Sequence, residues 1–165
     1  MKTILKLLIF SAILYIPYYF FTRINFEFDE AIHYSITDKQ IDKVINKDTL
    51  NNFDQIFMGD YPSEVDNNKF INELEKNGYT KRKIDANKLF GLKSILRFNI
   101  NPKLYGTVSA CAPSYRDIII LKKDNEISGI AKICFECEQY YFIGNSFYYS
   151  NFDEYEDLKE LLYSK

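Results

Sequence analysis

The sequence has only one histidine, His33, among its 165 residues. A single histidine excludes metal sites built from several histidines and most catalytic schemes that place a histidine base beside a nucleophile. The chain also lacks a glycine-rich phosphate loop, a nucleophile paired with a base, and a motif of paired acid and base residues. We therefore predict no catalytic residue, no cofactor and no metal site. His33 is expected to be a surface residue or a hydrogen-bonded structural residue.

An excess of charge is also lacking, because 21 Lys and Arg stand against 23 Asp and Glu, for a net charge of −2. Without a positive field to collect phosphates, nucleic acid is not expected as a partner. The composition is 47% hydrophobic and 17% aromatic, which suffices for a packed interior. No repeat or low-complexity segment divides the chain, and we expect one domain of the usual size, about 100–150 residues.

Residues 7–21, LLIFSAILYIPYYFF, form an uncharged run behind Lys2 and Lys6. Its length lies between that of a signal-peptide core and that of a full membrane span. No small-residue cleavage site follows the run, and no cysteine that a lipid could modify stands just after it. We therefore predict an uncleaved signal anchor, a transmembrane helix over residues 1–23. Secretion after signal cleavage is the alternative, and a buried helix is disfavoured because both faces of the run are apolar.

The charges that flank this run predict its orientation. Lys2 and Lys6 precede it, whereas Arg23 alone stands close behind it and is followed by acidic residues. The positive-inside rule then places residues 24–165, a single domain, outside the cytoplasm. The expected partners are the membrane, through the N-terminal helix, and another protein.

Apolar periodicity predicts several short helices in the domain. Thr37 and Gln40 have the spacing of a capping box at the start of the first helix, and Gly78 suits the left-handed end of the second. Residues 24–36 begin with strand-like alternation, residues 53–58 fit neither pattern, and residues 59–64 form a loop. The predicted helices span residues 38–47, 66–78, 86–96 and 153–163.

The clearest pattern lies in the C-terminal third. Residues 117–122 and 126–135 flank a short turn and predict an antiparallel hairpin, and residues 139–143 supply a third strand. Alternation in the second strand predicts one core face, with Lys132 on the other face. The predicted fold class is α+β, a small antiparallel sheet packed by several short helices and preceded by one N-terminal transmembrane helix.

Three cysteines, Cys111, Cys134 and Cys137, bracket this hairpin. With a two-residue turn, the register puts Cys111 opposite Glu138, so that a disulfide from Cys111 to Cys137 or to Cys134 is feasible. Residues three apart in a continuous strand point to opposite faces, which disfavours the pair of Cys134 and Cys137. A location outside the cytoplasm favours a structural disulfide with one leftover thiol. Buried free thiols, a three-thiolate metal site and redox catalysis are the alternatives.

The segments Cys111-Ala-Pro113, Arg116-Asp-Ile118 and Ile133-Cys-Phe-Glu-Cys137 resemble a loose group of small, uncharacterised, exported or membrane-anchored bacterial proteins. In that group a Cys-x-Pro segment leads into a strand, a turn and a second strand that ends in Cys-Phe-x-Cys. The resemblance covers about residues 111–137 and implies no activity. It does imply that the three cysteines belong together.

Two further sets of residues are candidate binding surfaces. Tyr115, Arg116 and Asp117, just before the first hairpin strand, could line a pocket, although Arg and Asp at a strand end are most often a solvated ion pair. Exposed aromatic side chains could form a second surface, and a core role for half of them is the alternative. These aromatic residues are Tyr140, Tyr141, Tyr148 and Tyr149.

Together these patterns favour a non-enzymatic, membrane-anchored binding or protective module with a structural cysteine cluster. The alternative is a thiol-dependent or zinc-dependent enzyme centred on Cys111, Cys134 and Cys137.

Overall fold

The computed structural model of the chain describes residues 23–24, 27–45, 52–65, 69–96, 98–99, 111–144 and 154–164. The predicted anchor lies outside these residues, apart from Arg23. Within the described ranges, no helix combines the length and the apolar character that crossing a membrane requires.

A five-stranded antiparallel sheet forms the centre of the domain, with the strand order β3-β2-β5-β6-β7. A separate antiparallel pair joins β1 (Arg23–Ile24) to β4 (Phe98–Asn99). The bounds of the five strands in the central sheet are Glu30–Ser35 for β2, Thr80–Lys83 for β3, Asp117–Lys123 for β5, Glu126–Cys134 for β6 and Gln139–Ile143 for β7.

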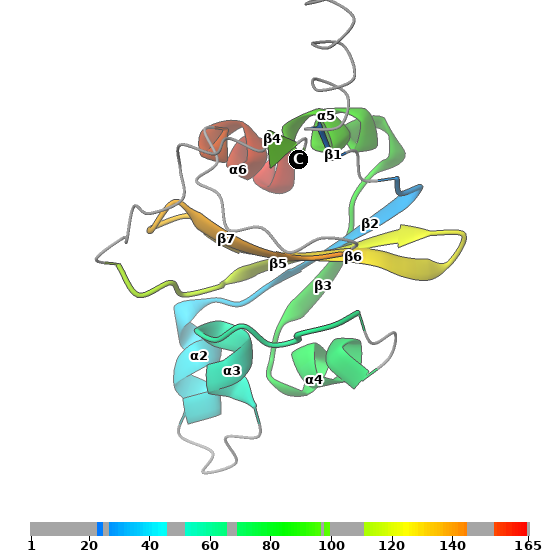
Figure 1. Cartoon of the computed structure of the whole chain (residues 1–165). Helices are drawn as coiled ribbons and strands as arrows, with labels where there is room; N and C mark the ends of the chain where they lie inside the picture. The colour runs from blue at the N-terminus through cyan, green and yellow to red at the C-terminus, as the bar shows by residue number, and fades with distance from the viewer. Residues whose placement is uncertain are drawn as a thin grey trace, which may run out of the picture.

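Helices cover both faces of this sheet (Figure 1). One layer contains α2 (Asp38–Ile45), α3 (Phe53–Phe57) and α4 (Lys69–Lys76). The opposite layer contains α5 (Leu89–Ile95), which follows the 3-10 turn η1 (Ala86–Lys88), and α6 (Tyr155–Tyr163). The predicted mixed α+β class with an antiparallel sheet is confirmed, and helices lie at the four predicted places.

Burial of both faces explains the continuous apolar run of β5. Ile118 and Ile120 pack toward α2, α3 and α4, whereas Ile119 and Leu121 pack toward α5 and α6. Strands that are covered on both sides show such runs in place of alternation. The prediction of a single core face in β6 was therefore wrong, and Lys132 is fully buried.

The predicted hairpin is confirmed. Lys123 pairs with Glu126 across a two-residue turn, in which Asp124 and Asn125 have φ angles of 52° and 69°. Positive φ at both central residues is typical of the type I′ turn that suits the twist of two paired strands. A register irregularity follows between Leu121 and Lys122, and it shifts the alternation of the remaining pairs by one residue.

The helix ends follow the predicted capping chemistry. The Thr37 N–H donates to Gln40 Oε1 at 2.8 Å, as the capping box requires. Gly78 has φ 83°, and the Tyr79 N–H donates to the Leu74 carbonyl at 3.1 Å, which is the hydrogen bond of a Schellman cap. That cap turns the chain directly into β3.

Candidate functional site

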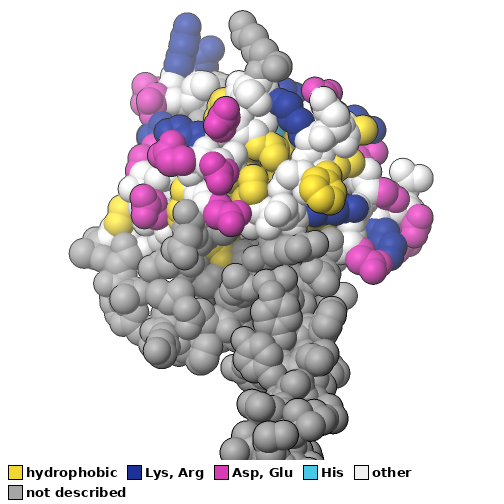
Figure 2. All heavy atoms as spheres, turned by 90° about the horizontal axis from the view of Figure 1, so that it is seen from above, with side chains coloured by type: hydrophobic (Ala, Val, Ile, Leu, Met, Phe, Trp, Pro, Cys, Tyr) yellow, Lys and Arg dark blue, Asp and Glu magenta, His cyan; other side chains and the backbone are white. Residues whose placement is uncertain are grey.

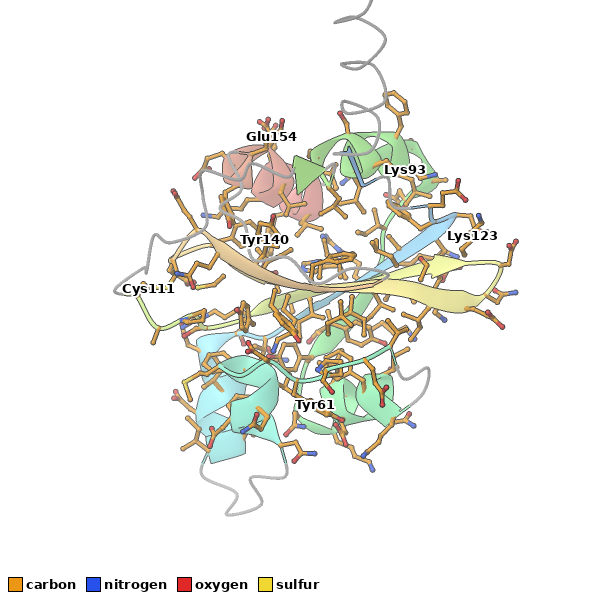
Figure 3. All side chains as sticks on the ribbon, viewed as in Figure 1. Tyr61, Lys93, Cys111, Lys123, Tyr140 and Glu154 are labelled. Carbon is orange, nitrogen blue, oxygen red and sulfur yellow. A yellow bond between two sulfur atoms is a disulfide. The ribbon has the colours of Figure 1, made fainter. Side chains whose placement is uncertain are left out.

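Residues 111–116, just before β5, and the β6–β7 turn, residues 135–138, meet at one end of the sheet, where Figure 3 labels Cys111. The Cα atoms of Cys111 and Cys137 are 5.7 Å apart, and their sulfur atoms lie at disulfide-bonding distance. This separation is within the usual range for a disulfide. One of the two predicted pairings is thus present, and it joins the segment before β5 to the turn that follows β6.

The third cysteine, Cys134, is a buried free thiol at the end of β6. The Ser114 backbone N–H donates to its sulfur at 3.3 Å, and the thiol lies 3.7 Å from Glu136 Oε2. The sulfur therefore has a donor on one side and an acceptor on the other. These two contacts join Cys134 to both segments that the disulfide connects.

Arg116 lies on the surface between these segments. Its Nη1 lies 2.5 Å from Asp38 Oδ1, and its Nε lies 3.7 Å from Glu136 Oε1. Both carboxylates are largely exposed, so each ion pair contributes about 0–1 kcal/mol. Arg116 therefore positions the start of α2 against the β6–β7 turn without adding much stability.

Tyr115 and Asp117 flank Arg116 but face opposite layers. Tyr115 is buried in the core beneath α2, α3 and α4, and its carbonyl accepts a hydrogen bond from the Tyr79 hydroxyl at 2.9 Å. Asp117 is buried toward α6, where Tyr163 donates to it. The structure thus does not bring Tyr115, Arg116 and Asp117 together around a common pocket.

Asp117 instead belongs to a buried polar cluster with His33 and Tyr163. Its Oδ1 lies 2.7 Å from His33 Nε2 and accepts a hydrogen bond from the Tyr163 hydroxyl at 2.6 Å. The rings of His33 and Tyr163 meet edge to face, with their centroids 5.6 Å apart. Burial, together with the hydrogen bond to Asp117, raises the pKa of Tyr163. This cluster ties the end of α6 to the centre of the sheet, and it makes His33 a hydrogen-bonded structural residue.

Lys132 forms a second buried polar centre on the opposite face. Its amine donates to the carbonyl oxygens of Gly59, Tyr61 and Gln55 at 2.5, 3.0 and 3.4 Å. The amine also lies 4.5 Å from the centroid of the Tyr115 ring, a cation–π distance. Burial lowers the pKa of Lys132 to about 7. The amine thus fixes the loop that includes Tyr61, labelled in Figure 3, against the sheet.

The predicted surface of exposed tyrosines is not present where the structure describes it. Tyr140 and Tyr141 are both buried, one in each core cluster, and Figure 3 shows Tyr140 between the sheet and the α6 layer. Tyr148 and Tyr149 lie outside the described residues. The core alternative therefore holds for two of the four.

Among the side chains that the structure describes, no three His, Cys, Asp or Glu residues are grouped so that they could hold a metal ion.

No protein-family model, no curated protein and no solved structure matches the chain. The resemblance of residues 111–137 to a group of exported or membrane-anchored bacterial proteins therefore stays a prediction.

Proposed function

We propose that this protein is a non-enzymatic, membrane-anchored binding module whose domain lies outside the cytoplasm. The observation that supports this most directly is the Cys111–Cys137 pair, because structural disulfides persist in oxidising compartments. The uncharged run at residues 7–21 would hold the domain at the outer surface of the membrane.

The partners of the reactive side chains support a binding role over catalysis. Asp117 is hydrogen-bonded to both His33 and Tyr163. The Lys132 side chain is fully buried, and its amine donates to backbone carbonyls. Cys134 is buried between a donor and an acceptor. These groups stabilise the domain from within, where a substrate has no access to them.

The exposed surface beside the disulfide is the binding surface that we propose. We call it the cysteine rim and define it as the exposed or partly exposed residues 111–114, 116 and 135–138. Cys111, Glu136 and Glu138 are exposed, and Arg116 is partly exposed. The disulfide fixes this surface in one conformation, and a preorganised surface loses less entropy when a partner binds. A protein with a polar, charged epitope is the partner that this surface suits.

Intact mass combined with thiol alkylation tests the proposal on full-length protein purified without reductant from its native membrane fraction. We expect an unprocessed N-terminus and two cysteines, Cys111 and Cys137, that alkylate only after reduction. A Cys134→Ser variant should keep this protected pair, whereas Cys137→Ser should expose Cys111 to the reagent. Loss of residues 1–23 from the purified chain would support secretion after cleavage.

The thiol-dependent or zinc-dependent enzyme is the second candidate, and one observation favours it: Cys134 is a free thiol in the same turn region as the disulfide. It predicts the opposite result in the same experiment. If all three cysteines alkylate readily in the native state, or if the purified protein carries zinc, the enzyme replaces the binding module.

A further inference from the structure

The chain enters the domain beside α5. Arg23 and Ile24 of β1 pair with Asn99 and Phe98 of β4, and β4 follows the end of α5 by only a few residues. Figure 1 shows both strands in the layer of α5 and α6, on the side of the sheet away from α2, α3 and α4. The first residues after the predicted anchor therefore lie in this layer.

An exposed aromatic ring lies on the same helix. The Phe90 side chain is 82% exposed, more than any other large hydrophobic residue that the structure describes. Lys93, labelled in Figure 3, is three positions further on and therefore on the same side of the helix. Lys93 Nζ lies 5.1 Å from the centroid of the Phe28 ring, and the side chain is also exposed. The helix α5 thus presents an apolar ring beside a basic group.

We propose that α5 docks on the lipid bilayer, with the Phe90 ring in the interfacial region and Lys93 at the lipid phosphates. This inference depends on the membrane anchor of the proposed function. The uncharged run ends two residues before Arg23, and two residues span at most about 7 Å. The anchor therefore keeps β1, and with it β4 and α5, close to the membrane surface. Aromatic and basic side chains are those that a bilayer interface accepts.

Charge limits the contact to the α5 end of the layer. The exposed side chains of Glu156, Asp157 and Glu160 lie on α6, and the exposed Glu154 is its N-cap. Figure 2 views this layer from above and shows hydrophobic side chains exposed between acidic and basic ones. Carboxylates are repelled by anionic lipids, so the domain tilts toward α5.

The absence of tryptophan from the chain provides the test. A Phe90→Trp variant contains a single tryptophan at the proposed contact. Ile45→Trp is the matched control, because Ile45 is 54% exposed and lies on α2 in the opposite layer. Both full-length variants are reconstituted in vesicles of phosphatidylcholine and phosphatidylglycerol, with and without brominated acyl chains. We expect the tryptophan fluorescence of Phe90→Trp to shift to shorter wavelength and to be quenched several-fold by bromine. Neither change is expected for Ile45→Trp. Lys93→Glu in the Phe90→Trp background should reduce the quenching.

Flotation of the vesicles after a high-salt wash separates the two proposals. If the protein floats but the fluorescence of both tryptophans is that of a ring exposed to water, the docking inference is wrong and the anchor stands. If the tryptophan of Phe90→Trp is shielded from aqueous iodide yet not quenched by bromine, the ring packs on protein, and docking on lipid is again refuted. If the protein does not float, the anchor itself fails and the inference fails with it.

Discussion

Replacement of Lys132 by Met is the most informative single perturbation of the core. Methionine matches the unbranched aliphatic part of lysine in length and lacks the terminal amine. Burial lowers the pKa of Lys132 from an ordinary value of 10.5 to about 7, and the Asp60 carboxylate partly offsets this shift. Between these two values the unfolded chain holds a proton that the folded chain lacks. The free energy of unfolding of the wild type must then rise with pH across this window.

The size of the effect follows from linkage. With a folded pKa of about 7 and an unfolded pKa of 10.5, the free energy of unfolding increases by about 3 kcal/mol from about pH 6 to about pH 9. Lys132→Met should lack this increase. The informative quantity is the difference in slope, because the substitution also leaves the three carbonyl acceptors without their donor at every pH.

The free energy of unfolding of both proteins is measured across this pH range by urea unfolding followed by circular dichroism. The disulfide is kept intact, and the full chain is in detergent micelles. Lys39→Met, at an exposed position of α2, is the control and should keep the wild-type slope. Parallel profiles for the wild type and Lys132→Met would refute the reasoning. They would mean that the three carbonyls and the Tyr115 ring hold the amine charged against the cost of burial.

Three further variants test the other ties in the domain. Replacing Cys111 and Cys137 together by Ser should lower the free energy of unfolding by about 3–4 kcal/mol, because the bond closes a loop with a sequence separation of 26; equal urea midpoints for the two proteins would contradict this. Tyr163→Phe removes the hydroxyl that donates to Asp117 and should lower the free energy of unfolding, measured by thermal unfolding, by about 1–2 kcal/mol. An unchanged melting temperature would show that this hydrogen bond does not stabilise the domain. Gly78→Ala should lower the free energy of unfolding by about 1–2 kcal/mol, because φ is 83° at this position. An unchanged melting temperature would show that the helix cap can adopt another backbone conformation without loss of stability.

Local sequence patterns predicted the elements whose conformation depends on residues that are close together in the chain. The hairpin follows from two strand-like segments around Asp124 and Asn125, and α2 follows from the Thr37 capping box. The strand β3 was missed because its sequence, TKRK, is exposed at every position and shows no alternation. Lys132 was assigned to a solvent face because a lone charge in a strand usually lies there, but helices cover both faces of this sheet.

The candidate site, too, was predicted only in part from the sequence. The cysteine pair was predictable because the hairpin register brings Cys111 to within a residue or two of its partner. The cluster of His33, Asp117 and Tyr163 was not, because its members come from β2, β5 and α6, which are far apart in the sequence. No short-range pattern records such a contact, and a single histidine between apolar residues gives no signal of its partner.

The pairing of β2 with β5 has a consequence for the order of folding. Ser35 and Asp117 are opposite each other in the sheet, about eighty positions apart in the chain. Of the two neighbours of β2 in the central sheet, β3 at Thr80–Lys83 is synthesised well before β5 at Asp117–Lys123. The hairpin of β5 and β6 needs only its own turn, and we expect it to form before β5 pairs with β2. Until then the edge of β2 that later pairs with β5 has unpaired backbone N–H and C=O groups, and such an edge can pair with another chain.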